Sequence, residues 1–152
     1  MRILMVCLGN ICRSPSAEGI LRQKLKQAGL ADKVTVDSAG IGGWHEGEAP
    51  DKRAQQTAKA RGYDISGLRA RQIQPEDFAR FDVILGMDNN NLIALKQMPQ
   101  KTAVVDLFLN YADTRKAEVA DPYYGDIRDF EAMFEQLEPN CDLIVKRIQE
   151  QL

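Results

Sequence analysis

The sequence predicts an α/β fold: a doubly wound, four-stranded parallel sheet with helices on both faces. Short, continuously apolar runs alternate with longer segments of helical spacing, beginning with the run at residues 3–6 and a helix over residues 15–28. Such runs are typical of strands buried on both faces of a parallel sheet. The 152 residues suffice for one core, so we expect a single domain over residues 1–152.

The remaining elements follow from the same two periods and from turn residues. Apolar runs predict further strands at residues 34–36, 81–88 and 104–107. Helical spacing predicts helices over residues 50–62 and 89–98, a short one starting at Pro75, and a long one over residues 127–152. Residues 38–51 and 110–125 show neither period and are expected to be loops. Because a proline inside a helix removes a hydrogen bond, Pro139 predicts a kink or break near Gln136.

Charge and composition narrow the functional classes. A net charge of −2 argues against a general nucleic-acid binder, and no apolar run is long enough to span a membrane. The N-terminus lacks a signal-peptide pattern, so a cytoplasmic location is expected. Three cysteines and one histidine show no metal-type spacing, which makes a structural zinc site an unfavoured interpretation. In a reducing compartment the three thiols would be free.

The loop after the first strand reads Cys7-Leu8-Gly9-Asn10-Ile11-Cys12-Arg13-Ser14-Pro15. Ser14 is the expected N-cap of the helix that follows, and Pro15 suits its first position. A strand-to-helix junction gathers unpaired backbone N–H groups and the positive end of the helix dipole, which suits a phosphate- or sulfate-like anion. Arg13 adds a planar fork that matches two phosphate oxygens. We therefore expect a phosphate-binding loop between the first strand and the first helix.

Cys7 is the candidate nucleophile of this loop. A cysteine in a positive field is expected to be a thiolate at neutral pH, and Ser14 is placed to donate a hydrogen bond to its sulfur. The competing interpretation is an anion-binding turn with an inert cysteine, but the strand, Gly-Asn turn, Arg-Ser-Pro and helix favour the nucleophile. Cys12 either fills space under the loop or pairs reversibly with Cys7, while Cys141 lies on an apolar helical stripe and is expected to be structural.

A second chemical motif lies far downstream, at Asp121-Pro122-Tyr123-Tyr124-Gly125. A carboxylic acid that protonates a departing phenoxide accelerates cleavage of an aryl phosphate, and Asp121 is the candidate if its loop folds back over the cleft. Tyr123 and Tyr124 are either cleft walls or core aromatics. Trp44, the only tryptophan, sits in a glycine-rich loop and is interpreted as a binding wall. Its neighbour His45 is interpreted as a solvated loop residue.

Residues 6–15, followed by Ala17 and Glu18, resemble the signature of the low-molecular-weight protein tyrosine phosphatases. The stretch at residues 121–125 is similar to the acid loop of that family, and Ser38-Ala39-Gly40 with the Trp44 region is similar to its loop beside the phosphotyrosine ring. The resemblance implies a protein-tyrosine phosphatase without metal or cofactor, with Cys7 as nucleophile, Arg13 as phosphate binder and Asp121 as general acid and base. It implies substrate binding by Leu8, Gly9, Asn10, Ile11, Cys12, Ser14, Trp44, Tyr123 and Tyr124.

The same resemblance implies regulation and partners. Family members with a second loop cysteine form a reversible bridge, which favours a redox role for Cys12. Phosphotyrosine proteins are the implied partners, including tyrosine kinases and polysaccharide-export regulators. One position departs from the family: a histidine that supports the loop through the counterparts of Asn10, Ser14 and Ser38 is replaced by Leu68, which puts that network in doubt.

Three alternatives compete with this interpretation. An arsenate reductase would share the fold and the anion loop, but those enzymes use further cysteines near the third strand, and this chain has only Cys141 downstream. Relatives specific for phosphoarginine carry a threonine where this chain has Ile11. A non-catalytic phosphoprotein-binding module would need neither Cys7 nor Asp121.

Overall fold

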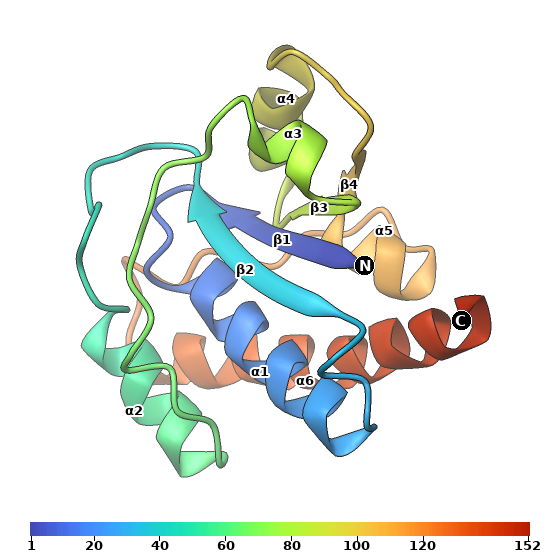
Figure 1. The fold of residues 1–152 in the computed structure, drawn as a ribbon. Coiled ribbons are helices and arrows are strands. Elements are labelled where there is room, and N and C mark those ends of the chain that lie inside the picture. The colour runs from blue at the N-terminus through green and yellow to red at the C-terminus, as the bar shows by residue number, and fades with distance from the viewer.

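In the computed structural model, which describes all 152 residues, four parallel strands form one sheet in the order β2-β1-β3-β4 (Figure 1). The central strand β1 spans Arg2–Cys7 and pairs on one side with β2 (Thr35–Gly40). On its other side lies β3 (Val83–Gly86), which pairs with the edge strand β4 (Val104–Leu107). The predicted α/β fold with a parallel sheet is confirmed.

Six helices cover the two faces of this sheet (Figure 1). Four helices lie on one face, and the helices α3 and α4 lie on the other. The bounds on the first face are α1 Arg13–Gln27, α2 Lys52–Ala60, α5 Phe108–Asp113 and α6 Ile127–Gln151, and on the second face α3 Asp77–Arg80 and α4 Asn89–Gln97. None of these helices has the combination of length and apolar character that a membrane crossing requires.

Side chains of β1 alternate between two hydrophobic clusters, one on each face of the sheet. Ile3, Met5 and Cys7 join the larger cluster, and Leu4 and Val6 join the smaller one. Successive side chains of a strand point to opposite faces, so a strand covered on both sides must be apolar throughout. This is why the run at the N-terminus is continuously hydrophobic.

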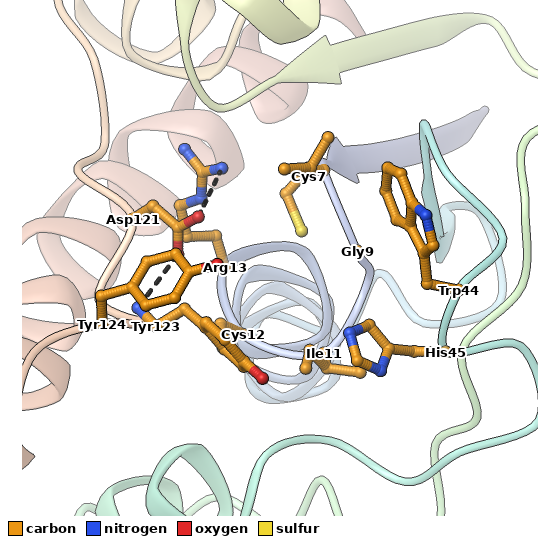
Figure 2. A pocket seen from close by; sticks show the side chains of 11 residues that line it. Cys7, Gly9, Ile11, Cys12, Arg13, Trp44, His45, Asp121, Tyr123 and Tyr124 are labelled. Atoms are coloured by element: carbon orange, nitrogen blue, oxygen red, sulfur yellow. Dashed lines mark hydrogen bonds and ion pairs between the residues drawn. The ribbon is translucent and has the colours of Figure 1, made fainter.

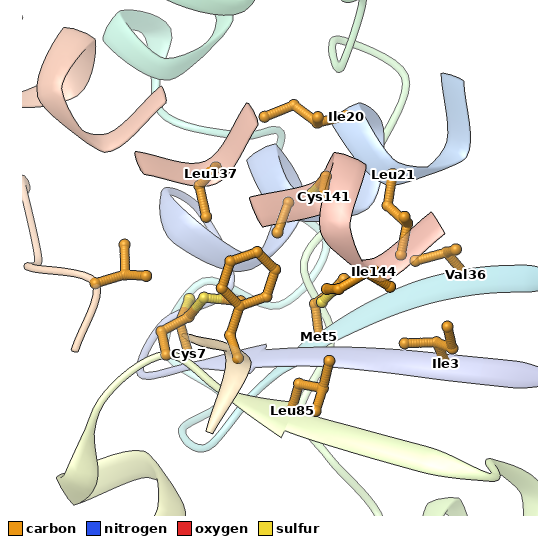
Figure 3. Close-up of a cluster of buried hydrophobic side chains, with 14 of the residues drawn as sticks. Ile3, Met5, Cys7, Ile20, Leu21, Val36, Leu85, Leu137, Cys141 and Ile144 are labelled. Atoms are coloured by element: carbon orange, nitrogen blue, oxygen red, sulfur yellow. The ribbon is translucent and has the colours of Figure 1, made fainter. Parts of the chain in front are cut away.

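The larger cluster lies between the sheet and helices α1 and α6 (Figure 3). Ile20 and Leu21 of α1 pack there with Leu137 and Ile144 of α6, all fully buried. Cys7 belongs to the same cluster. The root of the phosphate-binding loop is therefore part of the main core, which resists displacement because its packing is dense.

The first helix begins earlier than the sequence predicts. Its N-cap is Cys12, not Ser14, and no side chain caps it. The Ser14 hydroxyl is instead engaged by Cys7 and Asn10, so it is not available to the backbone N–H groups of the helix. The amino end of α1 is consequently left without a side-chain cap beside the loop.

Two other expectations about element bounds were wrong. Residues 38–40 belong to β2, because they pair with Met5–Cys7 of β1 despite their small side chains. Residues 110–113, expected in a loop, lie in α5, whose Phe108, Leu109 and Tyr111 are buried in the larger cluster. Tertiary packing thus overrides a weak local pattern.

The break predicted near Gln136 is absent, because helix α6 is continuous through Pro139. Apolar residues before and after the proline are buried in the same cluster, which holds both halves against the sheet. The Asn140 side chain donates from Nδ2 to the Gln136 carbonyl at 2.7 Å, which satisfies an acceptor one turn earlier. Cys141 is fully buried on this helix, as its place on the apolar stripe predicts.

Candidate active site

One cleft of about 290 Å³ opens at the carboxyl end of β1, where parallel sheets bind ligands (Figure 2). It brings together the phosphate-binding loop, the loop after β2 and the loop before α6. The residues that line it are Cys7, Leu8, Gly9, Ile11, Cys12, Arg13, Trp44, His45, Asp121, Tyr123 and Tyr124.

Cys7 is the last residue of β1, and its side chain is almost completely buried at the base of the cleft. Its Sγ lies 3.0 Å from the Ser14 Oγ. Asn10, which has a left-handed φ of 59°, donates from Nδ2 to the same Ser14 oxygen at 2.7 Å. A thiolate has no hydrogen to give, so when Cys7 is ionised the Ser14 hydroxyl, which accepts from Asn10, is the donor in this contact.

The backbone of this loop has a row of unpaired donors. No N–H group of residues 8–14 donates a hydrogen bond to another part of the chain. Backbone N–H groups are strong donors that proteins rarely leave unpaired at buried positions. Together with the positive end of α1, these groups form an anion-binding loop next to the Cys7 sulfur.

Arg13 brings positive charge to the same loop and is 2% exposed. Its Nη1 donates to Asp88 Oδ2 at 2.6 Å and to the Val119 carbonyl at 2.9 Å. Burial acts to lower the pKa of this guanidinium, but the charge of Cys7 and the hydrogen bond to Asp88 outweigh it and raise the pKa. Arg13 is therefore a fixed, permanent cation oriented for an anion.

Asp121 folds back over the cleft, as its proposed role requires. Its Oδ2 lies 3.8 Å from the Arg13 Nη2, and its Oδ1 accepts a hydrogen bond from the Tyr123 N–H at 3.1 Å. Its side chain is 39% exposed, so it meets both the anion-binding loop and the open mouth of the cleft. A carboxyl in this place can exchange a proton with a group bound above Cys7.

Aromatic side chains stand on two sides of the cleft (Figure 2). Trp44 lies on one side, whereas Tyr123 and Tyr124 lie on the other and pack edge to face with ring centroids 4.9 Å apart. Trp44 and Tyr124 are highly exposed, so they are walls and not core residues. Aromatic side chains in such positions can pack against a flat aromatic ring of a ligand.

His45 also lines the cleft, which the sequence analysis did not predict. Its Nδ1 lies 3.1 Å from Glu48 Oε2, and its ring centroid is 6.4 Å from that of Tyr123. It is therefore not a fully solvated loop residue. Glu48, three residues further on, is the signal in the sequence that could have indicated an anchored imidazole.

Asn10 and Ser14, two predicted substrate-binding residues, lie beneath the loop and not on the cleft surface. Asn10 donates to Ser38 Oγ at 3.0 Å, and Ser38 donates to Glu18 Oε1 at 2.6 Å. Glu18, itself buried, also pairs with Arg22. The supporting network is thus present although a leucine stands at the usual histidine position.

Leu68 itself is partly buried against the larger hydrophobic cluster. The polar contacts around the loop come instead from Glu18 and from the Arg71 N–H, which donates to Asn10 Oδ1 at 3.0 Å. All three cysteines are free thiols. Burial, and then the charge of Asp51, raise the pKa of the Cys12 thiol, which keeps it protonated at neutral pH.

Comparison with known proteins gives one consistent result. Residues 2–152 match the family model described as low molecular weight phosphotyrosine protein phosphatase. A relative from Bacillus subtilis, the low molecular weight protein-tyrosine-phosphatase YfkJ, is 39% identical over 98% of this chain and 96% of its own length.

Solved structures agree with this assignment. A protein tyrosine phosphatase from Entamoeba histolytica, with Hepes in the active site, has a TM-score of 0.92 at 35% identity over 99% of this chain and 98% of its own. A Drosophila arginine phosphatase has a TM-score of 0.89 at 34% identity over 97% of this chain and 98% of its own. The fold, the cleft and the match over nearly the full sequence lead to one conclusion: the chain belongs to the low molecular weight phosphotyrosine protein phosphatase family.

Proposed function

We propose that Cys7, Arg13 and Asp121 carry out the phosphatase reaction of this family in the present chain. The observation that carries the proposal is their convergence on one cleft, beside the unpaired N–H groups of residues 8–14. A nucleophile, a fixed cation and a carboxyl acid are the three groups that cleavage of a phosphate monoester requires.

In the first step the Cys7 thiolate attacks phosphorus. The S–P bond forms as the bond from phosphorus to the tyrosine oxygen breaks, and Asp121 gives its proton to that oxygen. Arg13 and the loop N–H groups hold the equatorial phosphate oxygens, on which negative charge is spread. The products are a cysteinyl phosphate and the dephosphorylated tyrosine side chain of the substrate.

In the second step water hydrolyses the cysteinyl phosphate. Asp121, now a carboxylate, takes a proton from the water as its oxygen attacks phosphorus, and Cys7 leaves as a thiolate. Ser14 stabilises the leaving sulfur by the hydrogen bond described above. Inorganic phosphate is released and the enzyme returns to its starting state.

Phosphotyrosine in proteins is the proposed substrate class. The cleft has aromatic walls formed by Trp44 and Tyr123, which fit an aryl ring, and the apolar Ile11 at its base. A threonine at the position of Ile11 would favour phosphoarginine, so the apolar side chain supports tyrosine. We further propose that a tyrosine kinase is among the protein substrates. We also propose a cytoplasmic location, which keeps Cys7 reduced.

The test is hydrolysis of 4-nitrophenyl phosphate and of a phosphotyrosine peptide in the presence of chelator and reductant. We expect activity in the unchanged protein and its loss in Cys7→Ser. Asp121→Ala should lose most turnover on phosphotyrosine yet still become phosphorylated on Cys7 by a substrate with a good leaving group.

Each competing function has its own outcome in the same assay. Binding of phosphate or phosphopeptide without hydrolysis would contradict the catalytic proposal and support a binding module. Preferred hydrolysis of phosphoarginine would contradict the substrate class. Thiol-dependent reduction of arsenate, without aryl phosphatase activity, would identify an arsenate reductase.

A further inference from the structure

The loop that carries Asp121 is anchored on both sides of that residue. Before it, the Val119 N–H donates to the Met87 carbonyl at 2.8 Å, and the Val119 carbonyl accepts from Arg13 at 2.9 Å. After it, the carbonyls of Tyr123 and Gly125 both accept from Arg53. The position of the Asp121 carboxyl therefore depends on these backbone anchors.

Arg53, in the first turn of α2, uses three nitrogens of its guanidinium group. Its Nε and Nη2 donate to the two oxygens of Asp51 at 3.1 and 2.9 Å. Its Nη1 donates to the Gly125 carbonyl and its Nη2 to the Tyr123 carbonyl, both at 2.9 Å. A planar fork of this kind fixes the direction of each bond, which a lysine ammonium does not.

Asp51 connects this guanidinium to the other half of the cleft. Its side chain caps α2 by accepting from the Arg53 N–H at 2.8 Å, and its own N–H donates to the Ile11 carbonyl at 2.8 Å. A short chain of contacts thus runs from the phosphate-binding loop through Asp51 and Arg53 to the two carbonyls of the acid loop. This chain sets the separation between the two halves of the site.

Aromatic packing restrains the same side chain. The guanidinium carbon of Arg53 lies 4.5 Å from the ring centroid of Phe130, which is fully buried, and 5.8 Å from that of Tyr123. Cation–π contacts at these distances are attractive. Arg53 makes no hydrogen bond or ion pair with Cys7 or Arg13; its direct contacts are with Asp51 and the acid-loop carbonyls, and its charge is also felt at Cys12.

We propose that Arg53 is a positioning residue for proton transfer, which holds the Asp121 loop over the phosphate-binding loop so that the carboxyl meets the leaving oxygen. The inference rests on the proposed function and deepens it. Without Arg53 the two carbonyls turn to water and the carboxyl moves out of line. Attack by Cys7 continues, but the P–O bond then breaks without a proton for the departing oxygen.

The experiment measures kcat/KM for aryl phosphates that differ in leaving group. Nitrophenolate leaves readily without a proton, whereas the phenolates of phenyl phosphate and phosphotyrosine do not. General-acid catalysis contributes roughly 10²–10⁴-fold, so losing part of it in Arg53→Ala should lower kcat/KM on phenyl phosphate by roughly 10- to 100-fold. On 4-nitrophenyl phosphate the loss should stay below about threefold on the same basis.

Matched variants separate positioning from stability. Arg61 lies at the other end of α2 and binds Glu138 of α6 at 2.7 Å without touching the acid loop. Arg61→Ala should change kcat/KM little, and by the same factor for both substrates. In an Asp121→Ala background, Arg53→Ala should not lower kcat/KM on phenyl phosphate any further, because the proton that Arg53 positions is already absent. Arg53→Lys should behave more like Arg53→Ala than like the unchanged protein.

Two results would overturn the inference alone: equal losses on both substrates in Arg53→Ala, or full additivity with Asp121→Ala. If Arg53→Ala does not fold, Arg53→Lys and Arg53→Gln carry the same comparison. Absence of Cys7-dependent hydrolysis in the unchanged protein would overturn the proposed function and this inference with it. If the unchanged protein is active and the variants show the same leaving-group dependence, the proposed function stands and only the inference about Arg53 is overturned.

Discussion

Replacing Asn10 by aspartate should reverse the hydrogen bonds behind the nucleophile. Both hydrogens of the Asn10 amide go to hydroxyl oxygens, those of Ser14 and Ser38. Each hydroxyl has one hydrogen: that of Ser38 goes to Glu18, and that of Ser14 goes to an ionised Cys7 at 3.0 Å in preference to the Ala39 carbonyl at 3.5 Å. An aspartate accepts where the amide donates, and both hydroxyl hydrogens would turn toward it and away from their present partners.

The size of the effect follows from the contact that is lost. A hydrogen bond to a charged group contributes about 1.5–3 kcal/mol, which corresponds to roughly a 10- to 100-fold loss of kcat/KM in Asn10→Asp. Asn10→Ala gives up three hydrogen bonds, the third from the Arg71 N–H, and places alanine at a φ of 59°. At about 1 kcal/mol each, the four losses lower the free energy of unfolding by about 4 kcal/mol.

The assay pairs kcat/KM on 4-nitrophenyl phosphate with urea unfolding for both variants. Asn10→Asp keeps an acceptor for the Arg71 N–H, so it should lose activity strongly and stability less than Asn10→Ala does. Adding Ser14→Ala to Asn10→Asp should have little further effect, because the aspartate acts through that hydroxyl. Full activity in Asn10→Asp would refute the assigned direction of the hydrogen bond to Cys7.

Other consequences can be tested separately. Burial raises the pKa of Glu18 above its unfolded value, so the folded state holds its proton more tightly. Stability therefore falls as pH rises from about 4.5 through the folded pKa. In Glu18→Gln the midpoint of urea unfolding should depend less on pH across that range. A Cβ on Gly19 would collide with Ile65 Cγ2, so Gly19→Ala should lower the melting temperature of the unchanged protein but should not lower that of Ile65→Ala any further. Peroxide should oxidise Cys7 to a sulfenic acid that Cys12 converts to a disulfide with release of water. In Cys12→Ser a second equivalent of peroxide should instead oxidise the sulfenic acid to the sulfinic acid, which reductant does not reverse, so excess peroxide followed by reductant should restore the unchanged protein but not the variant; equal recovery would contradict the bridge.

The sequence was most informative where local pattern and tertiary role agree. The apolar run of β1 and the Gly-Asn turn place the phosphate-binding loop without knowledge of any distant contact, although α1 begins before the predicted Ser14 cap. The strand at residues 104–107 was predicted with its observed bounds for the same reason. Elements that depend on a distant partner were the ones missed, such as α5, whose buried face is stabilised by packing and not by its own periodicity.

Contacts between distant residues explain what sequence reasoning left open in the site. Arg53 meets a carbonyl 72 positions away, and no periodicity in either segment indicates that meeting. Leu68 suggested a missing support for the loop, whereas Glu18 and Ser38, 20 positions apart, supply hydrogen bonds there. Such pairs become visible only when the fold brings the segments together.

The floor and the walls of the cleft differ in how they can change over evolutionary time. Cys7 and Arg13 are buried in or beside the main core, so a substitution there disturbs folding and chemistry together. Trp44 and Tyr124 are 68% and 95% exposed, and replacing them removes little buried surface. New substrate preferences can therefore arise at the walls without loss of the fold, and a lineage can exchange its phosphoprotein targets while its phosphate chemistry stays the same.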